Sequence, residues 1–192
     1  HPAGRIVATG ARGENAEVIV WDSTKKSGAE GSTEIVPLVV LRGPPKRAVT
    51  ALAFSSDGTQ LASVSQDPHH SVCVWNWKTQ KVLFAGQNTR HRVLCTCFRG
   101  NDVFVTAGVK HIFFWDLRER SRTAGVFGHR HMVAKQTILS VQSLDKENVV
   151  TGTASGHIYM WNGVNCVQCV KAHDRNVASL YVFGAGILSG EI

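Results

Sequence analysis

Charged residues are scarce in this chain of 192 amino acids, because Asp, Glu, Lys and Arg together make up 18% of it, below the usual value of about a quarter. Hydrophobic residues reach 43%, a balance that excludes a disordered or low-complexity chain. No apolar run approaches the roughly 18 residues that a membrane helix needs, and the N-terminal sequence HPAGRIVATG lacks a signal-peptide layout. We therefore expect a soluble globular domain with no membrane partner.

Cysteines are few and odd in number. The five cysteines are spread through apolar runs, and the chain has no N-x-S/T glycosylation sequon. This pattern disfavours a secreted disulfide framework and favours a reducing, cytoplasmic setting.

Acidic residues are in the minority. The 14 Asp and Glu face 21 Lys and Arg, which gives a formal net charge of +7 and a pI near 9.4. Such a charge favours an acidic partner, and composition alone leaves open nucleic acid, an anionic membrane or an acidic protein surface.

The motifs of phosphate and acyl chemistry are missing. The chain has no G-x-x-x-x-G-K-S/T loop, no G-x-G-x-x-G after a strand and no G-x-S-x-G elbow. Asp145 and Glu147 come closest to paired catalytic carboxylates, but their sequence, SLDKEN, is typical of a solvated turn. We expect no enzyme activity, no catalytic residue and no cofactor.

The pair Cys166-x-x-Cys169 is the strongest candidate for a metal or redox site. Residues i and i+3 of a regular strand point to opposite faces, however, and no second pair at zinc spacing follows. Cys73, Cys95 and Cys97 lie in apolar segments typical of packed thiols. We therefore expect no metal site.

A repeat organises the chain. The segments VIVWD, SVCVWN, HIFFWD and HIYMWN each end in Trp-Asp or Trp-Asn, and their tryptophans follow one another at intervals of 54, 40 and 46 residues. A period of about 40 to 45 residues is typical of a four-stranded β-propeller blade. The turn-rich insertion STKKSGAEGSTE accounts for the long first interval.

Each repeat contains short β-branched and aromatic runs divided by turn residues. The second repeat is complete and reads AVTALAFS, QLASVS, SVCVWNW and KVLFAG, separated by SDGT, QDPHH and KTQ. No long stretch has the 3.6-residue apolar period of a helix. We predict an all-β chain, a β-propeller with a little over four blades of a larger ring.

The predicted blades cover approximately residues 1–43, 44–87, 88–128, 129–173 and 174–192, of which the first and last are incomplete. A ring of seven blades would need about 300 residues. Since an open ring leaves apolar blade faces in water, we expect further sequence to complete it.

The repeat resembles the WD-repeat family, through its Trp-Asp or Trp-Asn strand ends and through Gly128-His129 and Ala172-His173-Asp174. HPAGRIVATG followed by VIVWD, KHIFFWD followed by GVFG, VVTGTASGHIYMW and KAHD are similar to the echinoderm microtubule-associated protein-like family. The resemblance implies the first blades of that family's N-terminal propeller.

The WD pattern usually braces each blade with hydrogen bonds among His, Ser or Thr, Asp and Trp. The third and fourth repeats lack the turn Asp, having Gly108-Val109-Lys110 and Ala154-Ser155-Gly156 in its place. We therefore expect stability to rest more on packing. The residues expected to have this structural role are Trp21, Trp75, Trp115, Trp161, Asp67, His129 and His173.

Propeller geometry sorts the charges by face. The loops from second to third strand, and from each fourth strand to the next first strand, emerge on one face, where we place eleven Lys and Arg against four Asp and Glu. The opposite face is balanced, and Arg5 and Glu191 are placed in strands. Eight of the nine histidines also fall on the basic face and would add charge as the pH falls. The basic residues are Arg12 and the ten that we expect to bind a partner, Arg42, Lys46, Arg47, Arg90, Arg92, Lys110, Arg130, Lys135, Lys171 and Arg175.

The predicted function is a non-enzymatic protein-binding scaffold. The resemblance implies tubulin or the microtubule as partner, in a cytoskeletal or ciliary setting, and an acidic protein surface suits the basic face. The alternative is a WD-repeat RNA-binding or general adaptor subunit of a larger complex. RNA is less favoured because no exposed aromatic series is available for base stacking, with Trp77 ambiguous. For any single cation, the alternative that it is an ordinary solvated loop residue with no binding role remains open.

Overall fold

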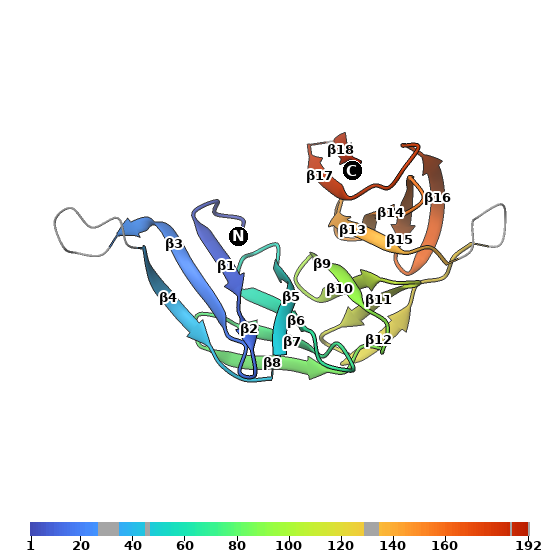
Figure 1. The fold of residues 1–192 in the computed structure, drawn as a ribbon. Helices are drawn as coiled ribbons and strands as arrows, with labels where there is room; N and C mark the ends of the chain where they lie inside the picture. Colours follow the sequence, from blue (N-terminus) through green and yellow to red (C-terminus); the bar gives the residue numbers. More distant parts are fainter. Residues whose placement is uncertain (27–34, 45–46, 129–134, 185, 192) are drawn as a thin grey trace. The chain divides into compact units, whose positions relative to one another are not determined.

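Strands make up the regular structure of the computed structural model, which describes residues 1–26, 35–44, 47–128, 135–184 and 186–191 (Figure 1). In that part of the chain eighteen strands and no α-helix occur, so the all-β prediction is confirmed. It follows that no helix among these residues is long and apolar enough to cross a membrane. The chain divides into two compact units, residues 1–90 and 91–192.

The first unit contains two sheets. One has the order β1-β3-β4, formed by β1 (Ile6–Gly10), β3 (Val18–Lys26) and β4 (Ile35–Leu41). The other has the order β2-β5-β6-β7-β8. It is formed by β2 (Arg12–Gly13), β5 (Arg47–Phe54), β6 (Gln60–Ser65), β7 (Val72–Asn76) and β8 (Lys81–Gly86). Since β2 follows β1 in sequence but pairs with β5, it links the two sheets.

The second unit contains two four-stranded meanders and a hairpin (Figure 1). The first meander is β9 (Val93–Arg99), β10 (Val103–Gly108), β11 (His111–Asp116) and β12 (Ser121–Ala124). The second is β13 (Ile138–Ser143), β14 (Asn148–Thr153), β15 (His157–Asn162) and β16 (Asn165–Lys171). The hairpin is β17 (Ser179–Phe183) and β18 (Gly186–Gly190).

The Trp-Asp and Trp-Asn pairs have a physical role in each sheet. Trp75, Trp115 and Trp161 are buried, and each indole N–H donates to a hydroxyl on the preceding strand. The bonds run from Trp75 to Ser63 (3.3 Å), from Trp115 to Thr106 (3.0 Å), from Trp161 to Thr151 (3.0 Å) and from the more exposed Trp21 to Thr9 (2.8 Å).

The residue after the tryptophan caps the next turn. Asp22 Oδ1 accepts the backbone N–H of Thr24 at 3.0 Å, Asn76 that of Thr79 at 3.1 Å and Asp116 that of Arg118 at 2.9 Å. A side-chain oxygen that binds a backbone amide two or three residues later favours a turn. The repeated dipeptide therefore combines a core residue with a turn signal.

Packing between the sheets of the second unit is tight. Trp161 lies in a core cluster with Val105, Ile112 and Phe114, so the two meanders pack together. A Cβ added to Gly125 would lie 2.4 Å from Ile112 Cγ2 and 2.8 Å from Trp161 Cζ3. At this close approach only glycine fits.

One apolar surface of the second unit is exposed. Tyr181 and Leu188 are cross-strand partners on β17 and β18, with exposed fractions of 63% and 59%, and Phe183, on the same face of β17, is 50% exposed. The other face, with Leu180 and Val182, packs against the neighbouring meander. The hairpin thus has one buried and one open apolar face.

Candidate interaction surface

Two ends of each sheet have to be distinguished. We define the leading end as the end where the first strand of a meander begins, the second turns into the third, and the fourth ends. The trailing end is the opposite one. In an antiparallel meander these points share one end because successive strands reverse direction.

At the leading end of the β9–β12 sheet, two cations flank one turn. Arg92 directly precedes β9, and Lys110 lies in the turn between β10 and β11. The backbone N–H of Val109 donates to the Arg92 carbonyl oxygen at 3.0 Å, which holds the two segments together. The side chains of Arg92 and Lys110 are exposed.

Three more cations surround the turn between β14 and β15. Exposed Lys135 precedes β13, Lys171 ends β16, and Arg175 lies between β16 and β17. The Lys171 ammonium donates to the Ser155 carbonyl oxygen at 2.9 Å and to that of Asp174 at 3.4 Å. These bonds fix Lys171 beside the turn.

Gly156 makes this arrangement possible. Its φ is +79°, a left-handed conformation that glycine adopts without steric cost. Its carbonyl oxygen accepts the backbone N–H groups of Ala172 and His173. A Cβ at Gly156 would lie 2.0 Å from the His173 carbonyl oxygen and 2.3 Å from that of Arg175, so a side chain here would push the loop away.

Arg99 shows that the two meanders point the same way. It ends β9, and its Nη1 donates to the carbonyl oxygens of Glu147 (3.3 Å) and Gly163 (2.7 Å), which are in trailing-end turns of the β13–β16 sheet. The guanidinium also lies 5.3 Å from the centroid of the Phe114 ring. The sequence analysis counted Arg99 among the charges of the balanced face and gave it no other role, although a cation that ends an apolar strand is a usable signal.

The hairpin has the same direction as the second meander. The Ser140 hydroxyl on β13 donates to the Val177 carbonyl oxygen at 3.0 Å, and the Val177 N–H donates to Thr153 at the end of β14. The chain entering β17 therefore lies at the leading end of β13–β16. In the described part of the second unit, Arg92, Lys110, Lys135, Lys171 and Arg175 all lie at leading ends.

Glu191 was wrongly placed by the sequence prediction. It follows β18 rather than lying in a strand, and its Oε2 accepts the Arg175 backbone N–H at 3.4 Å. It therefore belongs to the leading end, where Asp174 is the other described carboxylate. The five described cations of this unit therefore meet two anions, where the sequence count placed Asp174 alone among the same residues.

His173 braces the same corner. Its Nε2 lies 2.7 Å from the Ser189 hydroxyl, and its Nδ1 lies 3.7 Å from Glu191 Oε2. The order Ser189, His173, Glu191 is that of a nucleophile, base and carboxylate. The 3.7 Å separation is too long for the hydrogen bond that orients a catalytic imidazole, so we assign these residues to holding β18 against the loop.

In the β1-β3-β4 sheet, β4 directly precedes β5, the first strand of the next sheet, so β1, β3 and β4 have the places of a second, third and fourth strand. In the first unit, exposed Arg12, Arg42, Arg47 and Arg90 therefore lie at leading ends. Arg12 on β2 pairs with Ala48 beside Arg47. Arg42 forms an ion pair with Glu17, with 2.6 Å between Nε and Oε1, so its charge is partly neutralised. A hollow of about 400 Å³ borders this pair.

Some expected residues cannot be placed. Lys46, His129 and Arg130 lie outside the described residues, so their predicted roles are untested by the structure. Asp67 is described, and its carboxylate accepts the Ser65 hydroxyl at 2.5 Å and the His69 N–H at 2.9 Å. It therefore holds the turn from β6 to β7.

At the trailing ends, several charged side chains form ion pairs with each other or hydrogen bonds with groups of a turn. Arg118 pairs with Asp102 at 2.7 Å. Asp145 accepts the Asn148 side-chain amide and two backbone N–H groups, and these hydrogen bonds lower its pKa.

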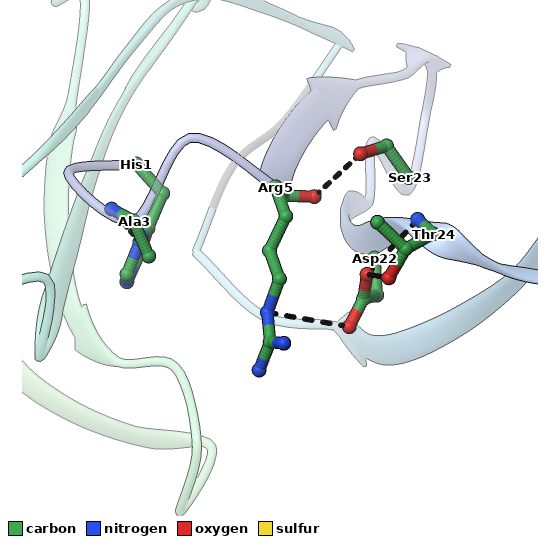
Figure 2. Close-up of polar contacts among 6 residues, drawn as sticks. All are labelled: His1, Ala3, Arg5, Asp22, Ser23 and Thr24. Carbon is green, nitrogen blue, oxygen red and sulfur yellow. Dashed lines mark hydrogen bonds and ion pairs between the residues drawn. The ribbon is translucent and has the colours of Figure 1, made fainter.

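Figure 2 shows the trailing end of the β1-β3-β4 sheet. Arg5 precedes β1 instead of lying in it, which corrects the sequence prediction. Its Nε lies 3.8 Å from Asp22 Oδ2, and its carbonyl oxygen accepts the Ser23 hydroxyl at 3.0 Å. Hydrogen bonds from Thr24 lower the pKa of Asp22, so this carboxylate remains charged beside Arg5.

The geometric argument against Cys166 and Cys169 was wrong. Met160 pairs with Gln168 and Trp161 with Cys166, so Val167 is an extra residue in a β-bulge. Because of the bulge, the two cysteines lie on one face of the sheet, the face that also carries their cross-strand partners Trp161 and Tyr159.

These cysteines nevertheless have the properties of packed thiols. Burial raises the pKa of Cys166 to about 11, and it also raises that of Cys169. Among the described residues, no three His, Cys, Asp or Glu side chains gather as metal ligands would. A high pKa keeps a thiol protonated and unreactive at neutral pH.

The surroundings of Trp77 show whether its ring could stack on a base. It is 5% exposed, its indole N–H donates to the Gly58 carbonyl oxygen at 2.7 Å, and its ring packs edge-on against Phe54 and His1. Its ring is therefore not an open stacking surface for a base.

The sequence matches a known family model. The model of the echinoderm microtubule-associated protein first β-propeller matches residues 1–191. Echinoderm microtubule-associated protein-like 2 of Mus musculus is 31% identical over 196 residues, with 96% of this chain and 29% of that protein covered. The 77 kDa echinoderm microtubule-associated protein of Strongylocentrotus purpuratus is 32% identical over 154 residues, with coverage of 75% and 22%. This chain thus spans less than a third of each relative.

Solved structures show the fold. The Cps50 (Swd1) β-propeller domain of Myceliophteria thermophila superimposes with a TM-score of 0.77 at 17% identity, covering 98% of this chain and 59% of that one. The C-terminal WD40 domain of Sif2 gives 0.71 at 22% identity, with 97% and 49% covered. The fold is a partial WD-repeat β-propeller, as the sequence predicted.

Proposed function

Because the chain belongs to the echinoderm microtubule-associated protein family, within the first β-propeller, we propose that it is a non-enzymatic scaffold that binds tubulin or the microtubule through the leading ends of its sheets. Its relatives are named as microtubule-associated proteins. The proposed setting is the cytoplasm, on the cytoskeleton, including that of a cilium or flagellum.

The observation that carries the proposal is the uneven charge of the second unit. Five exposed cations lie with two described carboxylates at its leading ends. Trailing-end charges, such as those of Arg118 and Asp102, pair with each other. A field of one sign on one side steers an oppositely charged partner and speeds association, and tubulin is strongly acidic.

The RNA-binding alternative has less support. In the described part of the chain, the exposed large aromatic residues are Tyr181 and Phe183 on β17, and neither lies at a leading end. Base stacking on aromatic rings is a main source of affinity for single-stranded nucleic acid. We therefore keep RNA, and a general adaptor role, as outcomes of the test.

The test compares two charge-reversed variants of the whole chain. One carries Arg47→Glu, Arg90→Glu and Arg92→Glu at leading ends. The control carries Arg118→Glu, Arg120→Glu and Lys146→Glu at trailing ends, and Arg122 is left intact because its guanidinium lies 4.5 Å from the Phe113 ring centroid.

The measurements are co-sedimentation with microtubules, pull-down of soluble tubulin and filter binding to RNA, each at low and near-physiological salt. We expect the leading-end variant to lose about tenfold in tubulin affinity and the control less than about twofold. Equal losses would refute the assignment of the surface. Salt-sensitive RNA binding without tubulin binding would replace the proposal by the RNA alternative.

A further inference from the structure

Three neighbouring strands of the second unit begin beside a cation. Arg92 directly precedes β9, Lys135 lies three residues before β13, and Arg175 lies four residues before β17. The three side chains are exposed. We call Arg92, Lys135 and Arg175 the cation row.

The cation row follows from packing of the first strands. β9 contacts β13, and β13 contacts β17. The Arg99 bonds at the trailing end, and the Ser140–Val177 bond, give the three strands one direction. The three strands therefore begin at the same end of this unit, and each cation precedes its strand at that end.

The row has the period of the repeat. Arg47, which begins β5 in the first unit, precedes Arg92 by 45 residues, and the next intervals are 43 and 40 residues. A cation at the start of successive first strands is thus a property of the repeat, whereas scattered loop charges would have no fixed interval. This regularity indicates a ligand that is itself regular along its length.

The spacing of the row fits an extended chain. Packed sheets lie about 10 Å apart, and a peptide in the extended polyproline II conformation advances about 3.1 Å per residue and turns every third side chain to the same side. An acidic side chain at every third residue would therefore meet successive cations. Neighbouring glutamates would instead crowd around one cation and leave the others unpaired.

The surroundings favour a peptide over a compact anion. A second hollow, of about 260 Å³, lies at the leading end of the second unit. It is bordered by Asp174 and Glu191 as well as by Lys171. Carboxylates at its rim repel a small multivalent anion that would have to enter the hollow, whereas an extended chain needs only one carboxylate beside each cation of the row. The described leading ends also lack exposed Phe, Tyr and Trp rings on which nucleic-acid bases could stack.

We propose that the cation row binds an extended acidic peptide segment, one carboxylate to each sheet, with the carboxylates three residues apart. This inference rests on the proposed function, because the segment would be an extended acidic part of the tubulin partner. It adds the extended conformation of that segment and the residues that bind it. Lys110 and Lys171 flank the row and strengthen its field.

The experiment uses two labelled dodecapeptides of equal composition, one with glutamate at every third position among glycine and serine, the other with its four glutamates contiguous. Binding to the whole chain is followed by fluorescence anisotropy at low and near-physiological salt. We expect the spaced peptide to bind about threefold more tightly, with an affinity that falls as salt rises. Equal binding of the two peptides, or none to the spaced one at low salt, would overturn the proposal.

Variants assign the row. Arg92→Glu, Lys135→Glu and Arg175→Glu together should weaken the spaced peptide about tenfold. Arg118→Glu, Arg120→Glu and Lys146→Glu, which change the net charge equally at the trailing end, should have less than a twofold effect. Circular dichroism shows whether each variant is folded, and single reversals replace a triple that is not. Equal losses in the two sets would refute the row.

The two proposals fail separately. If tubulin binds and is lost on leading-end reversal while the spaced peptide does not bind, the peptide inference is wrong and the tubulin function stands. If the spaced peptide binds through the row and tubulin does not, the function is wrong and the row still reads an acidic segment. Tubulin with its acidic tails removed by limited proteolysis should bind about tenfold more weakly than intact tubulin, and unchanged binding would contradict the inference.

Discussion

Trp161 donates its indole N–H to the Thr151 hydroxyl at 3.0 Å, and neither residue has any exposed surface. The same bond joins Trp21 to Thr9 at 2.8 Å on an exposed part of the first unit. One chemical interaction therefore occurs in two environments within this chain. Its contribution to stability can be compared between them.

Replacing Thr151 by Val should lower the free energy of unfolding by about 1 to 3 kcal/mol, because the buried indole N–H loses its acceptor and cannot reach water. Thr9→Val should cost less than about 0.5 kcal/mol, since water can replace the lost hydroxyl. Urea titration followed by tryptophan fluorescence measures the difference. Similar losses in the two variants would show that burial does not decide the value of this bond.

Gly156→Ala should be strongly destabilising, by about 2 kcal/mol or more. The residue has φ of +79°, and the new Cβ would collide with the carbonyl oxygens of His173 and Arg175. Gly163→Ala is the matched control, because φ there is +58° but nothing lies within 4 Å of the added Cβ.

The control should cost about 1 kcal/mol, the left-handed conformation alone. Thermal unfolding of the two variants gives the comparison. If Gly156→Ala proved no worse than Gly163→Ala, the tight contact of this turn with the β16–β17 loop would be wrong.

Alkaline pH should destabilise the chain through Cys97. Burial raises the pKa of this thiol to about 12, whereas an unfolded cysteine loses its proton near 8.5. Above that pH the unfolded state binds fewer protons than the folded state, so the stability contribution is complete below about 8.5 and declines as pH rises toward 12.

The loss from this thiol should reach up to about 1.4 kcal/mol per pH unit. Cys97→Ala should flatten the dependence of melting temperature on pH between about 8.5 and 10, whatever its effect at neutral pH. Cys169→Ala, at a partly exposed site, should flatten it less. Parallel curves for the chain and Cys97→Ala would disprove the prediction.

The open face of the β17–β18 hairpin should promote self-association. Tyr181, Phe183 and Leu188 form a contiguous exposed apolar group, and such patches drive association. Changing all three to Thr should reduce light scattering and concentration-dependent sedimentation. Val82→Thr with Leu83→Thr on β8, two less exposed residues, is the control and should change neither signal.

The strand pattern could be predicted because it depends on neighbours in sequence. Alternating apolar residues, turn residues and the Trp-Asp pairs identify β5 to β8 and the two meanders closely. The bulge at Val167 was not predicted, because a bulge depends on how the strand pairs with β15, and the sequence of one strand does not contain that information. The pattern of the third repeat also predicts a fourth strand over residues 123–128, but β12 ends at Ala124, and Val126 instead bonds to Val164 and Cys166 beside the next sheet.

The candidate surface could be predicted only in part. The sequence separates leading from trailing ends, since that follows from strand order, and so it placed Arg92, Lys110 and Lys171 at one end. It could not place Glu191, whose position depends on where β18 ends. It also missed the Ser189–His173 contact, which joins residues 16 positions apart.

Arg99 lies at the end of the second unit away from the proposed ligand, yet it ties β9 to two carbonyl oxygens of the adjoining sheet. The packing of β9 against β13, and with it the position of Arg92 relative to Lys135, thus rests partly on a clamp outside the proposed binding row. Evolution or an engineer could therefore retune which acidic sequence is preferred by altering the clamp, leaving every contacting side chain as it is.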